Sequence, residues 1–599
     1  MDIERHDFDV IVIGAGGAGL RAAVESSAAG VETALICKSL LGKAHTVMAE
    51  GGVAAAMGNV YPEDNWRVHF RDTMRGGKFL NNWRMAQLHA QEAPERVWEL
   101  EEWGALFDRT PDGRILQRDF GGHRYARLAH VGDRTGLEMI RTLQQNAVHK
   151  GIEVFMECTV MRLLRDPSSG RVSGAVGYWR ETGRFVLFTA KAVVLATGGI
   201  GKAWKITSNS WEYTGDGQSM AMWAGADLID MEFQQFHPTG MVWPPSVRGI
   251  LVTEGVRGDG GVLRNSEGER FMFDYIPELF KSETADTIEE ADRWYTDKSV
   301  RRTPDLLPRD EVARAINAEV KAGRGSPHGG VFLDIATRLP ADQIKRRLPS
   351  MYHQFRELAD VDITAEPMEV GPTCHYAMGG IRVDADTTAA TVEGLFAAGE
   401  CAAGLHGANR LGGNSLSDLL VFGKRAGECA AQAAKAVTGT PAVDESEVAK
   451  IAREALEPFG RDDGENPYTV HQDLQETMQE LVGIIRTESE LRRAVDELGV
   501  LKERAAKVKV EGHRQYNPGW HLALDLESLL NVAECTTLAA LERRESRGAH
   551  TRDDHPMTED AWGKVNVVLR HRDGAVDVSK EEIPPMPDDL RQIIEEPAT

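Results

Sequence analysis

The stretch Phe8-Asp-Val-Ile-Val-Ile-Gly-Ala-Gly-Gly-Ala-Gly19 decides the fold of the first part of the chain. The apolar run Phe8 to Ile13 predicts a short buried strand, and Gly14 to Gly19 predicts a tight turn. Small, helix-favouring residues follow from Leu20 to Ala29, and Val31 to Cys37 predicts a second strand. Strand, turn, helix and strand in this order indicate a βαβ unit.

Three glycines of this turn, Gly14, Gly16 and Gly19, have the spacing of a dinucleotide-binding fingerprint. The first permits the turn, the second lets the backbone approach a pyrophosphate, and the third lets the helix pack on the strand. A purely structural glycine turn is the alternative. The second strand ends at Lys38, where an acidic ribose partner is usual, and this disfavours an ordinary NAD site. We include Lys38 among the candidate cofactor-binding residues.

Two more buried-strand patterns lie far downstream, at Ala192 to Gly199 and at Gly394 to Glu400. Their spacing predicts an α/β nucleotide-binding domain that is interrupted by a capping domain. Within the cap, Ile276 to Thr303 is strongly charged without clean periodicity, which predicts a surface excursion. Helical periodicity after a polar linker near Thr438 predicts a helical bundle. We expect a discontinuous first domain over residues 1–240 and 363–437, a capping domain over 241–362, a helical domain over 438–550 and a C-terminal segment over 551–599.

Composition disfavours several classes of function. The formal net charge of -23 over 599 residues opposes nonspecific binding of nucleic acid, so any anion site has to be local. The six cysteines include no Cys-x-x-Cys pair, and we therefore expect reduced cytosolic thiols and no metal or iron–sulfur site in this chain. The early strand leaves no room for a leader peptide, and no apolar run approaches the roughly 18–20 residues of a membrane span. Membrane attachment is expected through another subunit.

The run Gly42-Lys-Ala-His45-Thr-Val-Met-Ala-Glu-Gly51-Gly52 resembles the flavin-attachment segment of the succinate dehydrogenase and fumarate reductase flavoproteins. The resemblance implies that the ring of His45 is bonded to the 8α carbon of FAD, and that Gly51 and Gly52 let the isoalloxazine lie close to the backbone. The implied bond raises the flavin potential, and for a two-electron couple about 30 mV is worth roughly 1.4 kcal/mol. An ordinary loop histidine is the alternative for His45 taken alone. Glu50 stands where relatives often carry glutamine.

The resemblance continues in order along the chain and covers residues from about 8 to 425, with a weaker match at Arg544 to His550. It implies a Rossmann-like FAD-binding domain with a capping domain, followed by a helical bundle domain and a small C-terminal segment. The matching segments are Gln117-Arg-Asp-Phe-Gly-Gly122, Thr214-Gly-Asp216-Gly, Glu232-Phe-Gln-Gln-Phe-His237-Pro-Thr-Gly240, Thr253-Glu254-Gly-Val-Arg257-Gly, Pro308-Arg309-Asp310, Pro372-Thr-Cys-His375-Tyr-Ala-Met-Gly-Gly380 and His406-Gly-Ala-Asn-Arg410-Leu-Gly-Gly-Asn-Ser415-Leu416.

A doubly negative dicarboxylate bound to an acidic protein needs a small cluster of cations and hydrogen-bond donors that fixes both of its ends. His237, Thr253, His375 and Arg410 supply such a set. The resemblance implies that these residues bind the carboxylates of succinate or fumarate, with the ring of Phe120 near the substrate. Each histidine taken singly would more often be a structural residue.

Arg309 matches the arginine that transfers a proton in the family, taking it from one methylene while hydride leaves the other for the flavin. Because a guanidinium is a poor base in solution, it needs a neighbour that holds or relays the proton. Our hypothesis for this relay is Glu254 with Arg257. A surface salt bridge between Arg309 and Asp310 is the alternative.

Four more positions match residues that hold FAD in relatives. Glu400 fits a contact to the ribose, and the backbone near Ser415 fits the pyrimidine edge of the flavin. The four residues are Asp216, Glu400, Ser415 and Leu416.

The sequence therefore predicts the flavoprotein subunit of a succinate dehydrogenase. This interpretation implies an iron–sulfur partner subunit, transfer of electrons to membrane quinone, and a peripheral location on the cytoplasmic face of the cell membrane, held by membrane anchor subunits. Fumarate reduction uses the same site in reverse, and the sequence does not fix the direction. L-Aspartate oxidase is a second alternative, which His45 opposes because that enzyme binds FAD noncovalently. A soluble fumarate reductase and a noncatalytic flavin-binding component are further alternatives.

Overall fold

The first domain is built on a seven-stranded sheet with the strand order β6-β2-β1-β9-β8-β7, in which β16 also pairs with β9. The computed structural model describes residues 3–439, 441–572 and 574–596. The pairs β1–β2, β1–β9 and β9–β16 are parallel, so their carboxyl ends meet at one edge of the sheet. The strands are β1 (Ile3–Ile13), β2 (Thr33–Ile36), β6 (Glu153–Phe155), β7 (Cys158–Arg165), β8 (Val172–Trp179), β9 (Phe185–Leu195) and β16 (Leu395–Ala397).

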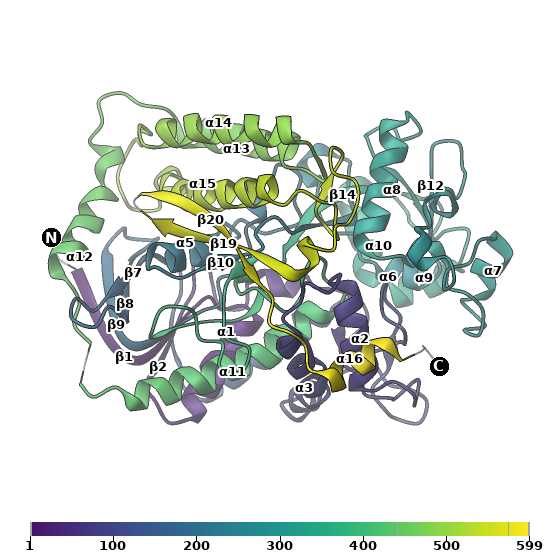
Figure 1. Cartoon of the computed structure of the whole chain (residues 1–599), viewed down its shortest axis with the longest axis horizontal. Helices are drawn as coiled ribbons and strands as arrows, with labels where there is room; N and C mark the ends of the chain where they lie inside the picture. Colours follow the sequence, from purple (N-terminus) through teal and green to yellow (C-terminus); the bar gives the residue numbers. More distant parts are fainter. Residues whose placement is uncertain (1–2, 440, 573, 597–599) are drawn as a thin grey trace.

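Helix α1 (Gly17–Ala28) follows the glycine turn and packs against the long helix α11 (Asn414–Ala436). Both are labelled in Figure 1, where α11 runs below α1. Small residues let the two helices approach closely, since a Cβ added at Gly427 of α11 would lie 2.2 Å from the carbonyl oxygen of Ala22. Other helices of this domain are α2 (Trp66–Gly76), α3 (Trp83–Glu102), α4 (Thr135–His149) and α5 (Asp216–Trp223).

The cap is a separate lobe, seen at the right of Figure 1, and it has its own hydrophobic core. A four-stranded sheet of order β11-β14-β13-β12 joins it to the first domain through β11 and β14, which pair with each other. Its strands are β11 (Gln234–Met241), β12 (Val262–Arg264), β13 (Val331–Asp334) and β14 (Met368–Ala377). Its helices are α6 (Gly255–Gly258), α7 (Ile288–Arg293), α8 (Arg309–Lys321), α9 (Ala341–Arg347) and α10 (Pro349–Ala359).

The predicted helical region contains α12 (Glu445–Glu454), α13 (Pro467–Leu481), α14 (Glu488–Ala505) and α15 (Pro518–Glu542), of which the last three pack on one another. The C-terminal segment does not stand apart. Its strands β19 (Val565–Arg572) and β20 (Ala575–Glu582) extend a sheet of order β15-β10-β19-β20, in which β10 (Leu228–Ile229) and β15 (Gly380–Ile381) come from much earlier in the chain. Helix α16 (Asp588–Glu595) then lies against α2.

The architecture confirms the predicted fold class of an α/β cofactor-binding domain with a capping domain and a helical domain. The exact boundaries between these units remain a prediction. No helix within the described residues is long and apolar enough to cross a bilayer.

The turn after β1 generates the first prediction. A Cβ added at Gly19 would lie 1.7 Å from the carbonyl oxygen of Gly14, so the Gly19→Ala variant has to push α1 away from the turn. We expect a loss of stability of about 1–3 kcal/mol or more, together with loss of bound flavin. Thermal denaturation and the flavin-to-protein absorbance ratio measure the two effects. The control is Gly499→Ala in α14, where an added Cβ meets nothing within 4 Å and should stabilise the helix by up to about 1 kcal/mol. Equal behaviour of the two variants would contradict the proposed packing role.

Candidate active site

One cavity runs from the glycine turn after β1 to the seam between the first domain and the cap. It brings together residues that are separated by up to several hundred positions in the sequence. Of the predicted site residues, Gly19 and Arg257 do not line the cavity: Gly19 packs α1 against the turn, and Arg257 lies behind Glu254. The predicted residues that do line it are Gly14, Gly16, Lys38, His45, Gly51, Gly52, Phe120, Asp216, His237, Thr253, Glu254, Arg309, His375, Glu400, Arg410, Ser415 and Leu416.

Backbone conformation and close contacts explain why the turn after β1 requires glycine. Gly14 has a φ of +109°, and a Cβ there would lie 2.2 Å from the carbonyl oxygen of Ala196 in the strand-end turn of β9. The backbone N–H of Gly17, at the start of α1, donates to Oγ1 of Thr46 at 3.2 Å. The segment next to His45 is thereby tied to the helix terminus that the fingerprint assigns to a phosphate.

Lys38 is neutralised by two carboxylates. Its Nζ lies 2.9 Å from Oδ2 of Asp216 and 2.7 Å from Oδ1 of Asp525, and it donates to Oγ1 of Thr214 at 2.9 Å. Burial lowers the pKa of Lys38, but the charges of Asp216 and Asp525 outweigh burial and raise it. Lys38 and Asp216 therefore form one ion-pair network at the cavity wall, to which α15 contributes Asp525.

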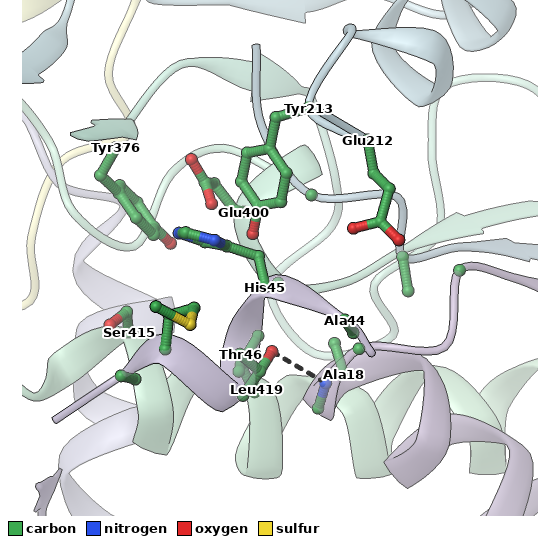
Figure 2. A pocket seen from close by; sticks show the side chains of 18 of the residues that line it. Ala18, Ala44, His45, Thr46, Glu212, Tyr213, Tyr376, Glu400, Ser415 and Leu419 are labelled. Atoms are coloured by element: carbon green, nitrogen blue, oxygen red, sulfur yellow. Dashed lines mark hydrogen bonds between the residues drawn. The ribbon is translucent and has the colours of Figure 1, made fainter. Parts of the chain in front are cut away.

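His45 opens a short 3-10 helix, His45–Met48, and its ring projects into the cavity between Tyr213, Tyr376 and Glu400 (Figure 2). The ring of Tyr213 meets it edge-on with centroids 4.8 Å apart. Burial, with a further contribution from the charge of Lys202, lowers the pKa of His45 to about 4. The imidazole is therefore neutral at pH 7, and its buried Nδ1 has no hydrogen-bond partner within the described part of the chain.

Glu400 is also buried beside this ring. Burial raises the pKa of its carboxyl to about 8, although the backbone N–H of Ala377 donates to its Oε1 at 3.0 Å. Glu400 therefore holds a proton over most of the neutral range and offers a hydrogen-bond donor to the cavity.

The two predicted histidines meet because β11 and β14 pair. The register places His237 opposite Thr373, and the rings of His237 and His375 lie 5.1 Å apart. Nδ1 of His375 is 2.8 Å from Oγ of Ser208, and Nδ1 of His237 is 2.9 Å from the carbonyl oxygen of Thr239. Burial, and then neighbouring positive or imidazole groups, lowers the pKa of both rings well below the usual range, so both are neutral.

Two guanidinium groups share one amide at the cavity floor. Oε1 of Gln235 accepts a hydrogen bond from Nη2 of Arg410 at 3.0 Å and another from Nη1 of Arg309 at 3.4 Å. Burial, reinforced by the charge of Arg309, lowers the pKa of Arg410 to about 9, which leaves it protonated at pH 7. This pair creates a local positive site in a chain whose overall charge is strongly negative.

Arg309, the first residue of α8, pairs with Glu254 and not with Asp310. Nε of Arg309 is 2.9 Å from Oε2 of Glu254, and Nη2 of Arg257 is 4.0 Å from the same oxygen. Burial alone would raise the pKa of Glu254, but the charges of Arg309 and Arg257 lower it to about 2. Asp310 instead accepts from Nδ2 of Asn409 at 2.8 Å. The alternative of a surface salt bridge is therefore wrong, since Arg309 is buried and its partner is Glu254.

Phe120 lies in the connection between β4 (Gln117–Arg118) and β5 (Leu128–Ala129), which belong to a small sheet with β3 (Val53–Ala54). Its ring packs on Gly51 and Gly412: Cβ atoms added at these glycines would lie 2.6 Å and 2.5 Å from ring carbons. The glycines are thus required where an aromatic ring closes one wall of the cavity.

Comparisons with known proteins identify the family of this chain. Residues 9–416 match the family model described as FAD binding domain, and residues 471–589 match the one described as Fumarate reductase flavoprotein C-term. One chain of the fumarate reductase (CoM/CoB) of Methanothermobacter marburgensis is 42% identical over 576 residues, covering 96% of this chain and 98% of the relative. The succinate dehydrogenase flavoprotein subunit of Coxiella burnetii is 38% identical over 592 residues, covering 95% of each.

The chain belongs to the succinate dehydrogenase and fumarate reductase flavoprotein family. It is an FAD-dependent oxidoreductase of the complex II type. A solved structure of Mycobacterium smegmatis Sdh1 in complex with UQ1 is 61% identical, covers 98% of this chain and 96% of that one, and superposes with a TM-score of 0.85.

Three residues of this flavoprotein site escaped the sequence analysis. Gln235 joins the two arginines, Tyr213 packs on His45, and Thr46 anchors α1. A signal existed for Gln235, because it lies two positions before His237 on a strand and therefore on the same face. No local pattern distinguished Tyr213 or Thr46 from ordinary loop residues.

Glu50 lies buried at the cavity wall next to Gly51. Burial, with a contribution from the charge of Asp133, raises the pKa of its carboxyl well above the ordinary value of 4.5. Its Oε2 has no hydrogen-bond partner among the residues that the structure describes. The folded protein therefore binds a proton at Glu50 more tightly than the unfolded chain does.

The sign of this shift yields a prediction. A raised folded-state pKa contributes stability below the unfolded pKa and loses it as the pH rises toward the folded pKa. Glutamine carries no such cost, so the Tm of Glu50→Gln should exceed that of wild type by an amount that grows from pH 5 to pH 8. Thermal denaturation across this range measures it. Glu267→Gln, at an exposed position of the cap, is the control and should show no growing difference. A pH-independent difference for Glu50→Gln would contradict the raised pKa of Glu50.

Proposed function

We propose that this chain is the flavoprotein subunit of a succinate dehydrogenase that oxidises succinate to fumarate with FAD bound covalently through His45. The observation that carries the proposal is the pair of buried guanidinium groups of Arg309 and Arg410 on Gln235, opposite two neutral histidines. Such a cluster suits a small dianion with a carboxylate at each end.

The residues present fit FAD. The glycine turn at the start of α1 would hold the pyrophosphate, and the backbone at Ser415 and Leu416 would meet the flavin ring. The imidazole of His45 projects into the cavity and is neutral at pH 7, so a ring nitrogen with a free lone pair is available to bond a carbon of the cofactor (Figure 2). When bound, FAD accepts two electrons as hydride.

The protein's own groups would then orient the substrate and remove a proton. Arg410, His237, His375 and Thr253 bind the two carboxylates, and Phe120 excludes water from one side. Arg309 first passes a proton to Glu254, 2.9 Å away, and onward along the relay toward Arg257, and the neutral guanidine then takes the proton from the methylene carbon. Although burial raises the pKa of Glu254, the charges of Arg309 and Arg257 lower it to about 2, so the carboxylate is ionised between turnovers and can accept the next proton.

Direction and partners are part of the proposal. The likeness to Sdh1 supports succinate oxidation, with electrons passing to an iron–sulfur protein and then to membrane quinone, while anchor subunits hold the chain at the cytoplasmic face of the membrane. The likeness to a chain of a fumarate reductase keeps the reverse reaction as the alternative. An L-aspartate oxidase-like activity is the third candidate, and His45 disfavours it.

Covalent attachment is tested by acid denaturation of the purified flavoprotein, followed by a fluorescence scan of the denaturing gel and peptide mapping. We expect fluorescence on the polypeptide, on the peptide that contains His45. The His45→Ala variant should bind FAD that acid releases completely, and His353→Ala, at an exposed histidine of the cap, should behave as wild type. If flavinylated wild-type protein released all its FAD, the covalent assignment would fail and aspartate oxidation would become the leading test.

Arg309→Gln tests the proton transfer. The variant removes the proton carrier but leaves the carboxylate-binding histidines and Arg410, so kcat for succinate should fall by about 10²–10⁴-fold while flavin content is retained. Steady-state assays with succinate and fumarate, using artificial redox partners, measure it. Arg324→Gln, which removes the Arg324–Glu319 pair at the far end of α8, is the matched control and should keep wild-type kcat. Retained turnover in Arg309→Gln would exclude Arg309 as the proton carrier.

A further inference from the structure

The charged segment Ile276–Thr303, here called the cap excursion, is exposed over much of its length, but its last part contacts the seam between the cap and the first domain. Its Arg302 donates from Nη2 to the carbonyl oxygen of Phe120 at 2.8 Å and from Nη1 to that of His123 at 2.6 Å. Lys298 adds an ion pair to Asp119, with Nζ 3.1 Å from Oδ2. The cap excursion therefore makes three polar contacts with residues 119–123 of the first domain, here called the Phe120 loop.

A second contact of the cap excursion reaches the relay arginine. The hydroxyl of Tyr295 donates to the backbone carbonyl oxygen of Arg257 at 2.9 Å. Nη1 of Arg257 donates in turn to the carbonyl oxygen of Asp305, just after the excursion, at 2.6 Å. The aromatic ring of Trp294 makes cation–π contacts with both basic side chains. Nζ of Lys298 lies 3.1 Å from the ring centroid, and the guanidinium carbon of Arg302 lies 5.1 Å from it.

The loop that Arg302 binds also holds the relay carboxylate, Glu254. Gly121 lies next to Phe120, one of the two residues whose carbonyls Arg302 binds, and its N–H donates to Oε1 of Glu254 at 2.6 Å. The other oxygen of Glu254 meets Nε of Arg309 at 2.9 Å. Through Arg302 and Tyr295, the cap excursion therefore fixes the surroundings of Glu254 and the backbone of Arg257.

We propose that the cap excursion sets the geometry of the proton relay, with Arg302 and Tyr295 as positioning residues for Glu254 and Arg257. This positioning role rests on the proposed function of Arg309, Glu254 and Arg257.

The distances explain why such positioning matters. The first link of the relay, Arg309 to Glu254, is a short hydrogen-bonded pair, but the second, Glu254 to Arg257, spans 4.0 Å. Proton transfer needs heavy atoms about 2.6–3.2 Å apart or a single bridging water. At 4.0 Å the second link is too long for direct transfer, so it needs a bridging water or a closer approach of the two side chains, and it depends on how both are held. Within the described chain, the hydrogen bonds of Arg302 and Tyr295 go to backbone carbonyls and not to the carboxylate-binding side chains.

The experiment uses the complete, flavinylated protein and compares Arg302→Met and Tyr295→Phe with wild type. Both variants should lower kcat for succinate, Arg302→Met by about tenfold or more, since a displacement of ~1 Å can cost on the order of 100-fold. KM should change by less than about twofold, because the carboxylate contacts are intact. The solvent deuterium isotope effect on kcat should increase, and the pH profile should shift, as proton transfer becomes the slow step. A structural role alone would lower stability without these kinetic changes.

Arg301→Met is the matched control. Arg301 is the neighbour of Arg302, and its ion pairs in the described chain, with Asp286 and Glu290, stay within the cap excursion, so its loss should leave kcat and the isotope effect unchanged. Arg302→Lys should restore only part of the rate, since an ammonium group does not reproduce the planar fork that spans two carbonyls. Tyr295→Phe removes a single hydroxyl and keeps the test available if Arg302→Met loses flavin or fails to fold.

The outcomes distinguish the positioning role from the proposed function. Arg302→Met and Tyr295→Phe with wild-type kcat and isotope effect would overturn the positioning role while leaving the proposed function intact. An increase in KM at unchanged kcat would also overturn it, because the cap excursion would then act on substrate binding. Absence of succinate and fumarate turnover in the flavinylated wild type would instead contradict the proposed function itself.

Discussion

The site depends on two positive charges that are held side by side away from water. Arg309 and Arg410 share the amide oxygen of Gln235, and within the described residues only Arg309 has a carboxylate partner, Glu254. A buried charge without compensation is costly, and burial accordingly depresses the pKa of Arg410 to about 9. The stability of the rest of the fold offsets this cost, and the dianionic substrate that we propose would reduce it.

This constraint also explains why the cap and the first domain have to act together. Arg309 begins a helix of the cap, whereas Arg410 precedes α11 of the first domain, and Gln235 lies on β11, which joins the two. Glu254 belongs to the cap but is held by the backbone of Gly121 from the first domain. Neither unit contains the whole cluster, so the contacts along their seam, including those of the cap excursion, fix the relative positions of the residues that line the cavity.

On the cofactor side of the cavity, one short segment both carries His45 and contacts the start of α1. Thr46 ties the start of α1, where the fingerprint glycines lie, to the 3-10 helix that presents His45. The fingerprint turn and His45 are thus fixed relative to each other by a single side chain. The same burial that surrounds the His45 ring in the cavity also lowers its pKa and keeps the imidazole neutral.

The sequence by itself determined the features that depend on local pattern. The glycine turn and the buried strands followed from short segments whose spacing carries meaning. The run around His45 and the roles of Arg309, His237, His375 and Arg410 followed from ordered segments that resemble a known family. The tertiary structure alone decided which groups face one another. Lys38 pairs with Asp525, 487 positions away, Arg309 pairs with Glu254 rather than its neighbour Asp310, and the charged excursion returns to grip the Phe120 loop. Such contacts are set by side-chain packing across elements distant in sequence, and periodicity within a single segment holds no information about them.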